Sequence, residues 1–429
     1  MSAGRRRGRI VPAAPGSRVS RLELFYDLVF VLAFLNVTTL LSANLTVHTL
    51  LAGLLVLALL WWCWVSFAAL GNAVRTDQGV LPLIGAVTVV ALFVLNLSLP
   101  EAFTNRPGGP PGPLVFAVCY LVVRAVQVLV LLTRSDVPGR AALRFGLPLL
   151  ASVTLLLVAG ALQHQQVAGP TWLQLALWAA AVGIEFTAGS RVRSVGLAVV
   201  SAAHWAERYA LILLIALGES IISLGLGPKP TAGRPISWAV IVASILGVTT
   251  IAALWWMYFD TLAPALEQQL HRTRDPDARA AYARDVYAYL HLPLIAGIIL
   301  FALGVKRYLA VIADPHGDPW RVRALGLDYR VLFAGVIIYL VGLLALGVRA
   351  SRRVRLLPAV TVVVLAAVLL PAGRLPAVAG LAVLALACVA LVLAGLRASD
   401  PLRRQVRQVA LNEQIAAEQE QSQWRRRHL

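Results

Sequence analysis

Long apolar runs, separated by short stretches of charged residues, proline or glycine, make up most of the 429-residue chain. A transmembrane helix needs about 20 predominantly apolar residues, and twelve runs of roughly 17 to 25 residues meet this requirement. The pattern therefore predicts an all-α polytopic membrane protein with about 12 transmembrane helices. The predicted spans are 23–45, 48–70, 80–100, 113–133, 144–162, 171–188, 204–226, 236–260, 286–305, 329–348, 355–371 and 376–396, of which the eleventh is the shortest.

The second half of the chain repeats short patterns of the first half in the same order. Residues 23–25 match 207–209, 60–64 match 254–258, 81–84 match 292–295, and 147–148 match 357–358. Fixed-order self-similarity indicates a duplication. Six spans per unit is an even number, so we expect two parallel repeats about an axis along the membrane normal, with the first and seventh spans as partners.

This duplication divides the chain into two units with a tail at each end. We expect a basic N-terminal tail (1–19), a first six-helix repeat (20–190), a second six-helix repeat (191–397) and a helical C-terminal tail (398–429). The C-terminal tail is polar and begins near Pro401, a residue well suited to a first helical turn. It could serve at a contact of a homo-oligomer.

Composition agrees with this class, since 59% of the residues are hydrophobic and 14% are charged. The net charge of +18 is spread over loops and tails, so contact with anionic lipid explains it better than nucleic-acid binding does. A cytoplasmic N-terminus places 27 of the 38 Lys and Arg residues on the inner side. We therefore predict a multi-pass membrane protein with both termini cytoplasmic. The loop 306–330, with five basic residues on the predicted outer face, is the exception and makes a miscounted span nearby the first suspect.

No cofactor or metal is predicted. Cys63, Cys119 and Cys388 fall within apolar spans and lack paired spacing, so they indicate neither disulfides nor a thiolate site. The chain contains no phosphate-binding loop, zinc-protease motif or nucleophile elbow. It also lacks paired Asp-rich metal-binding motifs. These absences leave no recognised catalytic constellation.

Acidic residues open the first span. Glu23 and Asp27 are four residues apart and share one helix face, and Asn36 follows roughly 13 Å beyond them. Ionisable groups in the membrane are costly, so each is a candidate functional residue. The alternative for Glu23 is a position among the lipid headgroups, where it helps to start the helix.

The seventh span is the second polar concentration. His204, Glu207 and Arg208 have i, i+3 and i+4 spacing, which predicts a cluster on one face. Glu219, followed by Ser220, lies about 17 Å further along at nearly the same azimuth. A lone buried carboxyl group would be protonated or paired.

Arg124, halfway along the fourth span, is the simplest partner for Glu219. Alternatively, a pair of Arg124 with Glu219, and of Arg208 with Asp27 or Glu23, fixes helix register without chemistry. We expect Glu185 and Asp260 to be charges at helix ends, and His291 to lie at headgroup level rather than to act as a proton relay.

The tryptophans of the second and eighth spans recur at matching positions: Trp61, Trp62, Trp255 and Trp256. They could form an aromatic box. Amphipathic rings are also common between packed helices and near membrane interfaces, and the recurrence favours a shared packing role within each half.

The segment 23–31, Glu-Leu-Phe-Tyr-Asp-Leu-Val-Phe-Val, resembles the opening signature of the bacterial low-temperature-requirement A (LtrA) family of membrane proteins. A second signature of that family is similar to His204, Glu207–Arg208 and 217–220. The resemblance extends over most of residues 18–400. It implies a multi-pass fold in the bacterial inner membrane and leaves the biochemical activity open.

A more distant likeness concerns the potassium channels of lysosomes and bacteria that are built from six-helix repeats. Arg21, Phe25 and Asp27 have the spacing of an Arg-x-x-x-Phe-Ser-Asp motif in their first helix, although Tyr26 replaces the serine and the second repeat lacks both the Arg and the Asp. First helices line the pore in that family. The likeness implies an apolar constriction made by Val31, Leu35, Ile212 and Ile215.

Two hypotheses remain from the sequence. The first is a channel or transporter for a monovalent cation or proton along the first and seventh spans, with Asp27, Glu207 and Glu219 as charged stations. The second is an intramembrane enzyme that acts on a lipid or isoprenoid ligand, in which the same carboxyl groups perform acid–base catalysis in an aromatic-lined cavity. Transport is favoured because the repeat axis offers a route.

Overall fold

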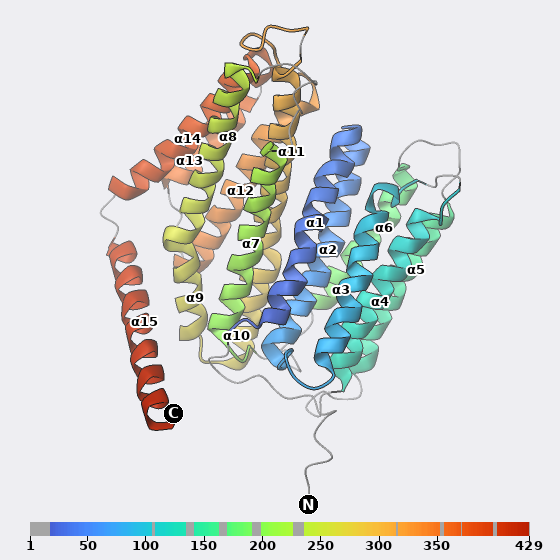
Figure 1. Cartoon of the computed structure of the whole chain (residues 1–429), viewed down its shortest axis with the longest axis vertical. Helices are drawn as coiled ribbons and strands as arrows, with labels where there is room; N and C mark the ends of the chain where they lie inside the picture. The colour runs from blue at the N-terminus through green and yellow to red at the C-terminus, as the bar shows by residue number, and fades with distance from the viewer. Residues whose placement is uncertain are drawn as a thin grey trace, which may run out of the picture.

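The computed structural model describes residues 18–104, 108–133, 141–162, 170–190, 199–225, 236–314, 316–351, 356–369, 371–397 and 401–428. Within these ranges the fold is all-α, without a β-strand (Figure 1). The first half contains α1 (Arg21–Ala43), α2 (Val47–Ala73), α3 (Leu81–Ser98), the 3₁₀ turn η1 (Leu99–Glu101), α4 (Gly112–Leu132), α5 (Ala141–Ala161) and α6 (Trp172–Ser190).

The second half has more interruptions. It contains α7 (Ala202–Gly225), α8 (Trp238–Met257), η2 (Tyr258–Leu262), α9 (Ala263–Arg272), α10 (Pro276–Ala283), η3 (Arg284–Tyr289), α11 (His291–Ile312), α12 (Leu327–Ser351), α13 (Leu356–Leu369), η4 (Ala372–Arg374), α14 (Ala377–Arg397) and α15 (Pro401–His428). Both η2 and η3 are single π-helical segments, whereas η4 is a 3₁₀ turn.

Eleven helical segments of the described chain are long and apolar enough to cross a membrane, which confirms an all-α polytopic membrane protein. The eleventh predicted span corresponds to α13, whose 14 residues cover only about 21 Å. The eighth and ninth predicted spans are longer than expected, because α8 continues through η2 into α9 and α10 continues through η3 into α11. The helical segments of 35 and 37 residues are longer than the hydrocarbon core of a bilayer is thick, which is about 30 Å.

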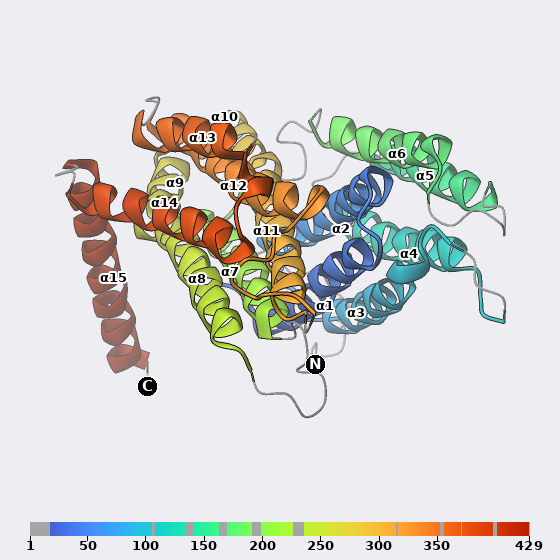
Figure 2. The same cartoon turned by 90° about the horizontal axis from the view of Figure 1, so that it is seen from above.

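The centre of the molecule is formed by α1, α2, α7 and α11 (Figure 2). Helix α1 contacts α2, α3, α7 and α11, so the first and seventh predicted spans pack against each other. Helices α3 to α6 lie on one side of this centre, and α8, α9 and α12 to α15 lie on the other (Figure 2). The contact between α1 and α7 therefore has further helices on both of these sides.

The contacts within the two halves follow a similar order. In the first half α1 contacts α2 and α3, α3 contacts α4, and α2 contacts α6; in the second half α7 contacts α8 and α11, α11 contacts α12, and α8 contacts α14. These are the pairings expected if α7 to α14 repeat α1 to α6. The duplication, with its boundaries at 20–190 and 191–397, stays a prediction.

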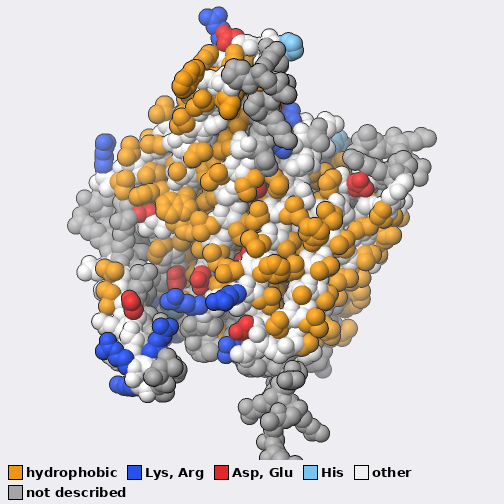
Figure 3. Space-filling view, in the orientation of Figure 1, with side chains coloured by type: hydrophobic (Ala, Val, Ile, Leu, Met, Phe, Trp, Pro, Cys, Tyr) orange, Lys and Arg blue, Asp and Glu red, His pale blue; other side chains and the backbone are white. Residues whose placement is uncertain are grey.

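Hydrophobic side chains cover the middle of the molecular surface, and Lys and Arg side chains gather mainly toward one end (Figure 3). Helix α1 begins at the same end of the bundle at which α15 ends (Figure 1). Helix α15, which contacts α9 and η2, extends away from the bundle as a 28-residue helix. Its proposed role in an oligomer stays a prediction.

The basic loop 306–330 lies at the opposite end. Lys306 Nζ donates to Ser42 Oγ at 3.3 Å, and Arg307 Nη1 donates to the Ser42 carbonyl oxygen at 3.0 Å. These contacts place the start of the loop beside the last turn of α1, where a cation stabilises exposed helix carbonyls. Arg307 also pairs with Asp328. The start and end of this loop therefore make local contacts that account for two of its basic residues, and its place on the outer face stays a prediction.

Candidate functional site

The contact between α1 and α7 contains a buried ion pair. Arg208 Nη1 donates to Asp27 Oδ2 at 2.7 Å, and the Arg208 and Asp27 residues are 0% and 1% exposed. Trp64 Nε1 of α2 donates to the other carboxylate oxygen, Oδ1, at 2.8 Å. Both oxygens of Asp27 thus have a strong donor, as a charge in a low-dielectric interior requires.

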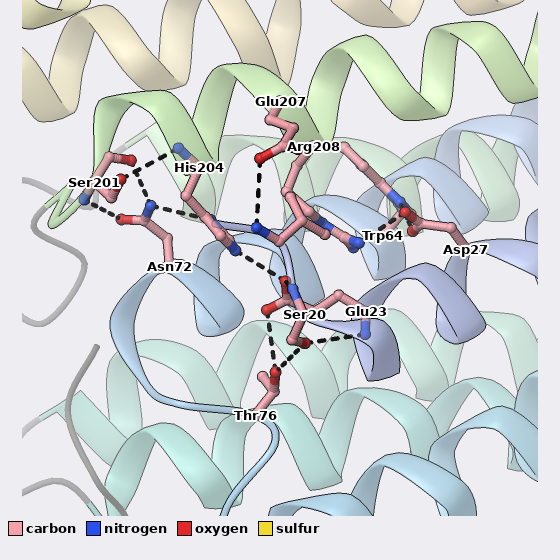
Figure 4. Close-up of polar contacts among 11 residues, drawn as sticks. Ser20, Glu23, Asp27, Trp64, Asn72, Thr76, Ser201, His204, Glu207 and Arg208 are labelled. Carbon is pink, nitrogen blue, oxygen red and sulfur yellow. Dashed lines mark hydrogen bonds and ion pairs between the residues drawn. The ribbon is translucent and has the colours of Figure 1, made fainter. Parts of the chain in front are cut away.

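Glu23 forms the adjacent part of the cluster (Figure 4). Its Oε2 accepts from the Ser20 backbone N–H at 3.0 Å and lies 2.9 Å from His204 Nε2, while its Oε1 accepts from Thr76 Oγ1 at 3.2 Å. Ser20 and Glu23 together form a capping box that starts α1. The helix-starting role expected for Glu23 is therefore real, and it coexists with a buried contact to α7.

Gly71 of α2 permits this arrangement. A Cβ atom at position 71 would overlap Oε1 of Glu23. The close approach of α2 to α1 therefore depends on the absence of a side chain at this position. On the same helix, Asn72 Nδ2 donates to the Ser201 carbonyl oxygen at 2.7 Å and lies 3.3 Å from His204 Nδ1. Asn72 thereby anchors the entry to α7 and holds the imidazole toward Glu23.

The guanidinium of Arg208 retains unused donors. Its Nε and Nη2 have no hydrogen-bond partner within the described residues, and the same holds for the hydroxyl groups of Tyr26 and Tyr209. The Arg208 Cζ lies 5.4 Å from the ring centroid of Trp64 and 5.7 Å from that of Phe67. Stacking on aromatic faces stabilises the cation, and the remaining donors can bind further acceptors.

Glu207 is oriented differently from its predicted partners. His204 and Arg208 are buried against α1, whereas Glu207 is exposed and its Oε2 accepts from the Val19 N–H at 3.4 Å (Figure 4). The predicted cluster of these three residues on one helix face therefore does not include Glu207. Positions 207 and 208 differ by about 100° in azimuth, whereas His204 and Arg208 differ by about 40° and share the face that packs against α1.

Arg124 belongs to a second buried cluster. Its Nη2 lies 2.9 Å from Glu185 Oε2, and its Nη1 donates to Gln127 Oε1 at 3.0 Å. Tyr120 and Ser152 donate to Glu185 Oε1 at 3.1 and 3.0 Å. The predicted pairing of Arg124 with Glu219 is wrong, and so is the assignment of Glu185 to an ordinary helix end. This cluster joins α4, α5 and α6 within the first half.

Glu219 stands near the opposite end of α7 from Arg208. It is fully buried, and its Oε1 accepts from Ser223 Oγ at 2.5 Å, whereas Oε2 has no hydrogen-bond partner within the described residues. Thr38 of α1 and Lys306 of α11 are the neighbouring polar groups that act on it. The adjacent Ser220 is also buried and donates to the Ala216 carbonyl oxygen at 3.4 Å.

An apolar segment separates the two ends of the α1–α7 contact. Phe30 and Phe34 of α1, together with Ile212, Leu213 and Ala216 of α7, are at most 1% exposed. Of the four residues predicted to form a constriction, Ile212 is fully buried, and Val31, Leu35 and Ile215 are half-buried. Their joint role as a constriction stays a prediction.

Asn36 lies outside this network. Its Nδ2 donates to the Asn96 carbonyl oxygen of α3 at 2.8 Å. Asn36 therefore binds α1 to α3 and does not extend the line of polar groups toward α7. Nine residues separate it from Asp27, which rotates it by about 180° around the helix.

The predicted aromatic box does not form. Trp61 and Trp62 are 1% and 7% exposed, and Trp61 Nε1 donates to the Ala288 carbonyl oxygen at 2.7 Å. Trp255 and Trp256 are 41% and 37% exposed on the outer surface of α8. The prediction of a shared packing role is also wrong, because α2 is central in the bundle and α8 is peripheral.

His291 is the buried residue that the sequence most clearly misassigned. It is fully buried, its Nε2 lies 2.8 Å from the Tyr258 hydroxyl, and its Nδ1 lies 2.9 Å from the Val286 carbonyl oxygen. Tyr258 and Val286 belong to the π-helical segments η2 and η3. The burial of His291 therefore depends on these two π-helical segments, and the apolar runs of the sequence do not reveal them.

Together, these features define an all-α membrane protein with one buried ionic cluster at the contact between α1 and α7 and a second within the first half. The model of the bacterial low temperature requirement A protein (LtrA) family matches residues 18–394, and the chain belongs to that family. It is also similar to the uncharacterized protein RA0937 of Rhizobium meliloti (strain 1021), with 29% identity over 310 residues that cover 68% of this chain and 70% of that protein. No solved structure matches the chain.

Proposed function

We propose that the protein conducts protons or a monovalent cation across the bacterial inner membrane along the contact between α1 and α7. The observation that carries this proposal is the position of buried carboxyl groups near both ends of that contact. Asp27 and Glu23 lie near one end with Arg208 and His204, and Glu219 lies near the other, buried beside Ser223 and Thr38. Buried ionisable groups of this kind mark ion and proton pathways in membrane proteins.

Protons suit these groups better than potassium ions do. Carboxyl and imidazole groups bind and release protons directly, and the Glu23–His204 contact of 2.9 Å is short enough for transfer. A dehydrated potassium ion instead needs several oxygen ligands at once. The buried side chains of Phe30, Phe34 and Ile212 would act as the barrier between the two ends, which opens only when the helices move.

The orientation follows the predicted charge asymmetry. With the start of α1 and the end of α15 in the cytoplasm, the cluster around Asp27 is the inner station and Glu219 is the outer one. The pathway then lies between the first helices of two proposed six-helix repeats. The outer entrance of this pathway would lie beside Lys306, whose positive charge repels an entering cation. The negative charge of Glu219 would offset this repulsion.

Reconstituted vesicles test this proposal. We expect the full-length protein to carry protons down an imposed potassium diffusion potential, and Asp27→Asn and Glu219→Gln each to reduce the rate strongly. The matched controls Asp77→Asn and Asp318→Asn remove carboxylates that are about half exposed, and we expect the wild-type rate from both. Proton and potassium fluxes no greater than those of empty vesicles, under gradients of either sign, would exclude the proposal.

An intramembrane enzyme is the second candidate. The observation in its favour is a cavity lined by Trp62, Trp205, Arg124 and Glu185. Neither Asp27 nor Glu219 lines this cavity, so the carboxyl groups predicted to perform catalysis would not meet a ligand there. The cavity therefore supports binding more directly than it supports acid–base chemistry.

A further inference from the structure

A cavity of about 140 Å³ lies between the two groups of helices, away from the α1–α7 contact. Residues of α2, α4, α5 and α6 form one part of its wall, and residues of α7, α10 and η3 form the other. The wall uses the last turns of α4 and α6 and the first turns of α5 and α7. It therefore extends from the end of the bundle at which α1 begins inward to Trp62 and Arg124, which lie well inside α2 and α4.

Buried donors without partners belong to the residues of this wall. Trp62 and Trp205 are each 7% exposed, and their indole Nε1 atoms have no hydrogen-bond partner within the described residues. Nε of Arg124 likewise has no hydrogen-bond partner within the described residues. An indole N–H and a guanidinium N–H can only donate, so a complementary ligand must supply acceptor atoms. Because buried donors are rarely left unpaired in native proteins, these three donors favour a bound ligand in the cavity.

The charge of the wall specifies the ligand further. Three arginines, Arg124, Arg144 and Arg284, line the cavity together with one acidic residue, Glu185. Glu185 is already paired with Arg124 at 2.9 Å, and Arg284 contacts Asp285 at 2.8 Å. Arg144 is exposed. The excess of positive charge attracts an anion, and arginine is the residue that binds phosphate oxygens most specifically.

The rest of the wall is apolar and includes Val65, Leu70, Leu131 and Phe145. A free inorganic anion would gain nothing from these side chains, whereas an acyl chain would be removed from water or from looser lipid contacts. We infer that the cavity binds an anionic membrane lipid, with its phosphate head at Trp62, Trp205 and the arginines and the beginning of its acyl chain against the apolar side chains. This site goes beyond the proposed transport and does not depend on it.

Native mass spectrometry of the full-length protein in a mild detergent tests the inference. The probes are phosphatidylglycerol and phosphatidylcholine with identical acyl chains. We expect tighter binding of phosphatidylglycerol, and Trp205→Phe should weaken it roughly tenfold, since one N–H donor to a charged acceptor is lost while the ring remains. Arg144→Gln changes an exposed side chain and should weaken it severalfold without affecting folding.

The matched controls are Trp238→Phe and Arg321→Gln, which alter a tryptophan 76% exposed on α8 and an exposed arginine in the loop at the opposite end. Both should bind phosphatidylglycerol as the wild type does. Equal binding of the two lipids, or unchanged binding by both Trp205→Phe and Arg144→Gln, would overturn the inference. Displacement of phosphatidylglycerol by inorganic phosphate but not by more lipid would also overturn it, in favour of a free anion.

Discussion

Asp27 of α1 and Arg208 of α7 form a 2.7 Å ion pair that is closed off from solvent and links the first helices of the two halves. Such a pair can stabilise the fold, serve transport, or do both. The two roles can be separated, because stability depends on the balance of the two charges and transport depends on a carboxyl group that can titrate.

Asp27→Asn leaves the Arg208 cation buried without its counterion, and we expect a loss of about 3–5 kcal/mol in the free energy of unfolding. The double variant Asp27→Asn, Arg208→Gln removes both charges and should recover most of this loss. Thermal and denaturant unfolding in detergent measure both values. The exposed pair Arg75–Asp77 is the control, and its neutralisation should change stability by about 1 kcal/mol or less.

The same double variant should remain inactive in the vesicle assay. Restored stability with absent proton flux would show that Asp27 contributes more than structure. Full flux in a double variant that lacks both charges would contradict its role as a station.

Trp64→Phe removes the N–H that donates to Asp27 but keeps a ring near the Arg208 guanidinium. We expect a loss of about 1.5–3 kcal/mol, since the acceptor is charged. Trp61→Phe is a matched comparison on the same helix, because Trp61 donates to the neutral carbonyl of Ala288. Its loss should be about 0.5–1.5 kcal/mol. Equal losses, measured by denaturant unfolding, would argue against a charged Asp27.

Much of the fold could be predicted from the sequence. The length of an apolar run decides whether a helix can cross a bilayer, and this requirement is strong enough to locate eleven long helices and the short α13. The internal match of 23–25 with 207–209 led to the expectation that α1 and α7 are neighbours, and they do pack together. The buried contact between Asp27 and Arg208 was among the alternatives for the same reason.

The partners of individual charges could not be predicted in the same way. Periodicity gives the azimuth of a residue on its own helix but not which neighbour faces it, so Arg124 was paired with Glu219 instead of Glu185. Spacing likewise groups Glu207 with His204 and Arg208 on one side of α7, but it does not show that the boundary between buried and exposed positions falls within the 100° that separates Glu207 from Arg208. His291 became buried through the packing of η2 and η3, and the sequence carries no comparable signal for π-helical segments.

Gly71→Ala tests the close approach of α2 to Glu23. The added Cβ would overlap the carboxylate, so the contact with His204 or Thr76 must shift, and we expect a loss of about 1–3 kcal/mol. Gly183→Ala in α6 is the control, because a Cβ there meets nothing within 4 Å and alanine favours the helix. Unfolding curves that rank the two variants in the opposite order would contradict the role of Gly71.

Glu207→Gln tests whether Glu207 lies outside the pathway, as its exposure indicates, or is a charged station of it, as the sequence pattern predicts. Glu207 is exposed and accepts a long 3.4 Å contact from the Val19 N–H, so we expect stability within about 0.5 kcal/mol of the wild type and an unchanged proton flux. Glu23→Gln, one helix away, alters the buried contacts to His204 and Thr76 and should lower both. A loss of flux in Glu207→Gln equal to that in Glu23→Gln would restore Glu207 to the pathway.

The last prediction concerns which acid neutralises Arg124. In a double-mutant cycle, Arg124→Gln and Glu185→Gln should be strongly coupled, by about 1–3 kcal/mol, because each single change leaves the other charge buried at a former contact of 2.9 Å. Arg124→Gln and Glu219→Gln should be additive within about 0.5 kcal/mol, since their side chains belong to separate clusters. Denaturant unfolding of the wild type, the three single variants and the two double variants provides both cycles. Coupling of Arg124 to Glu219 with additivity toward Glu185 would show that the arrangement of α4, α6 and α7 differs from the one described.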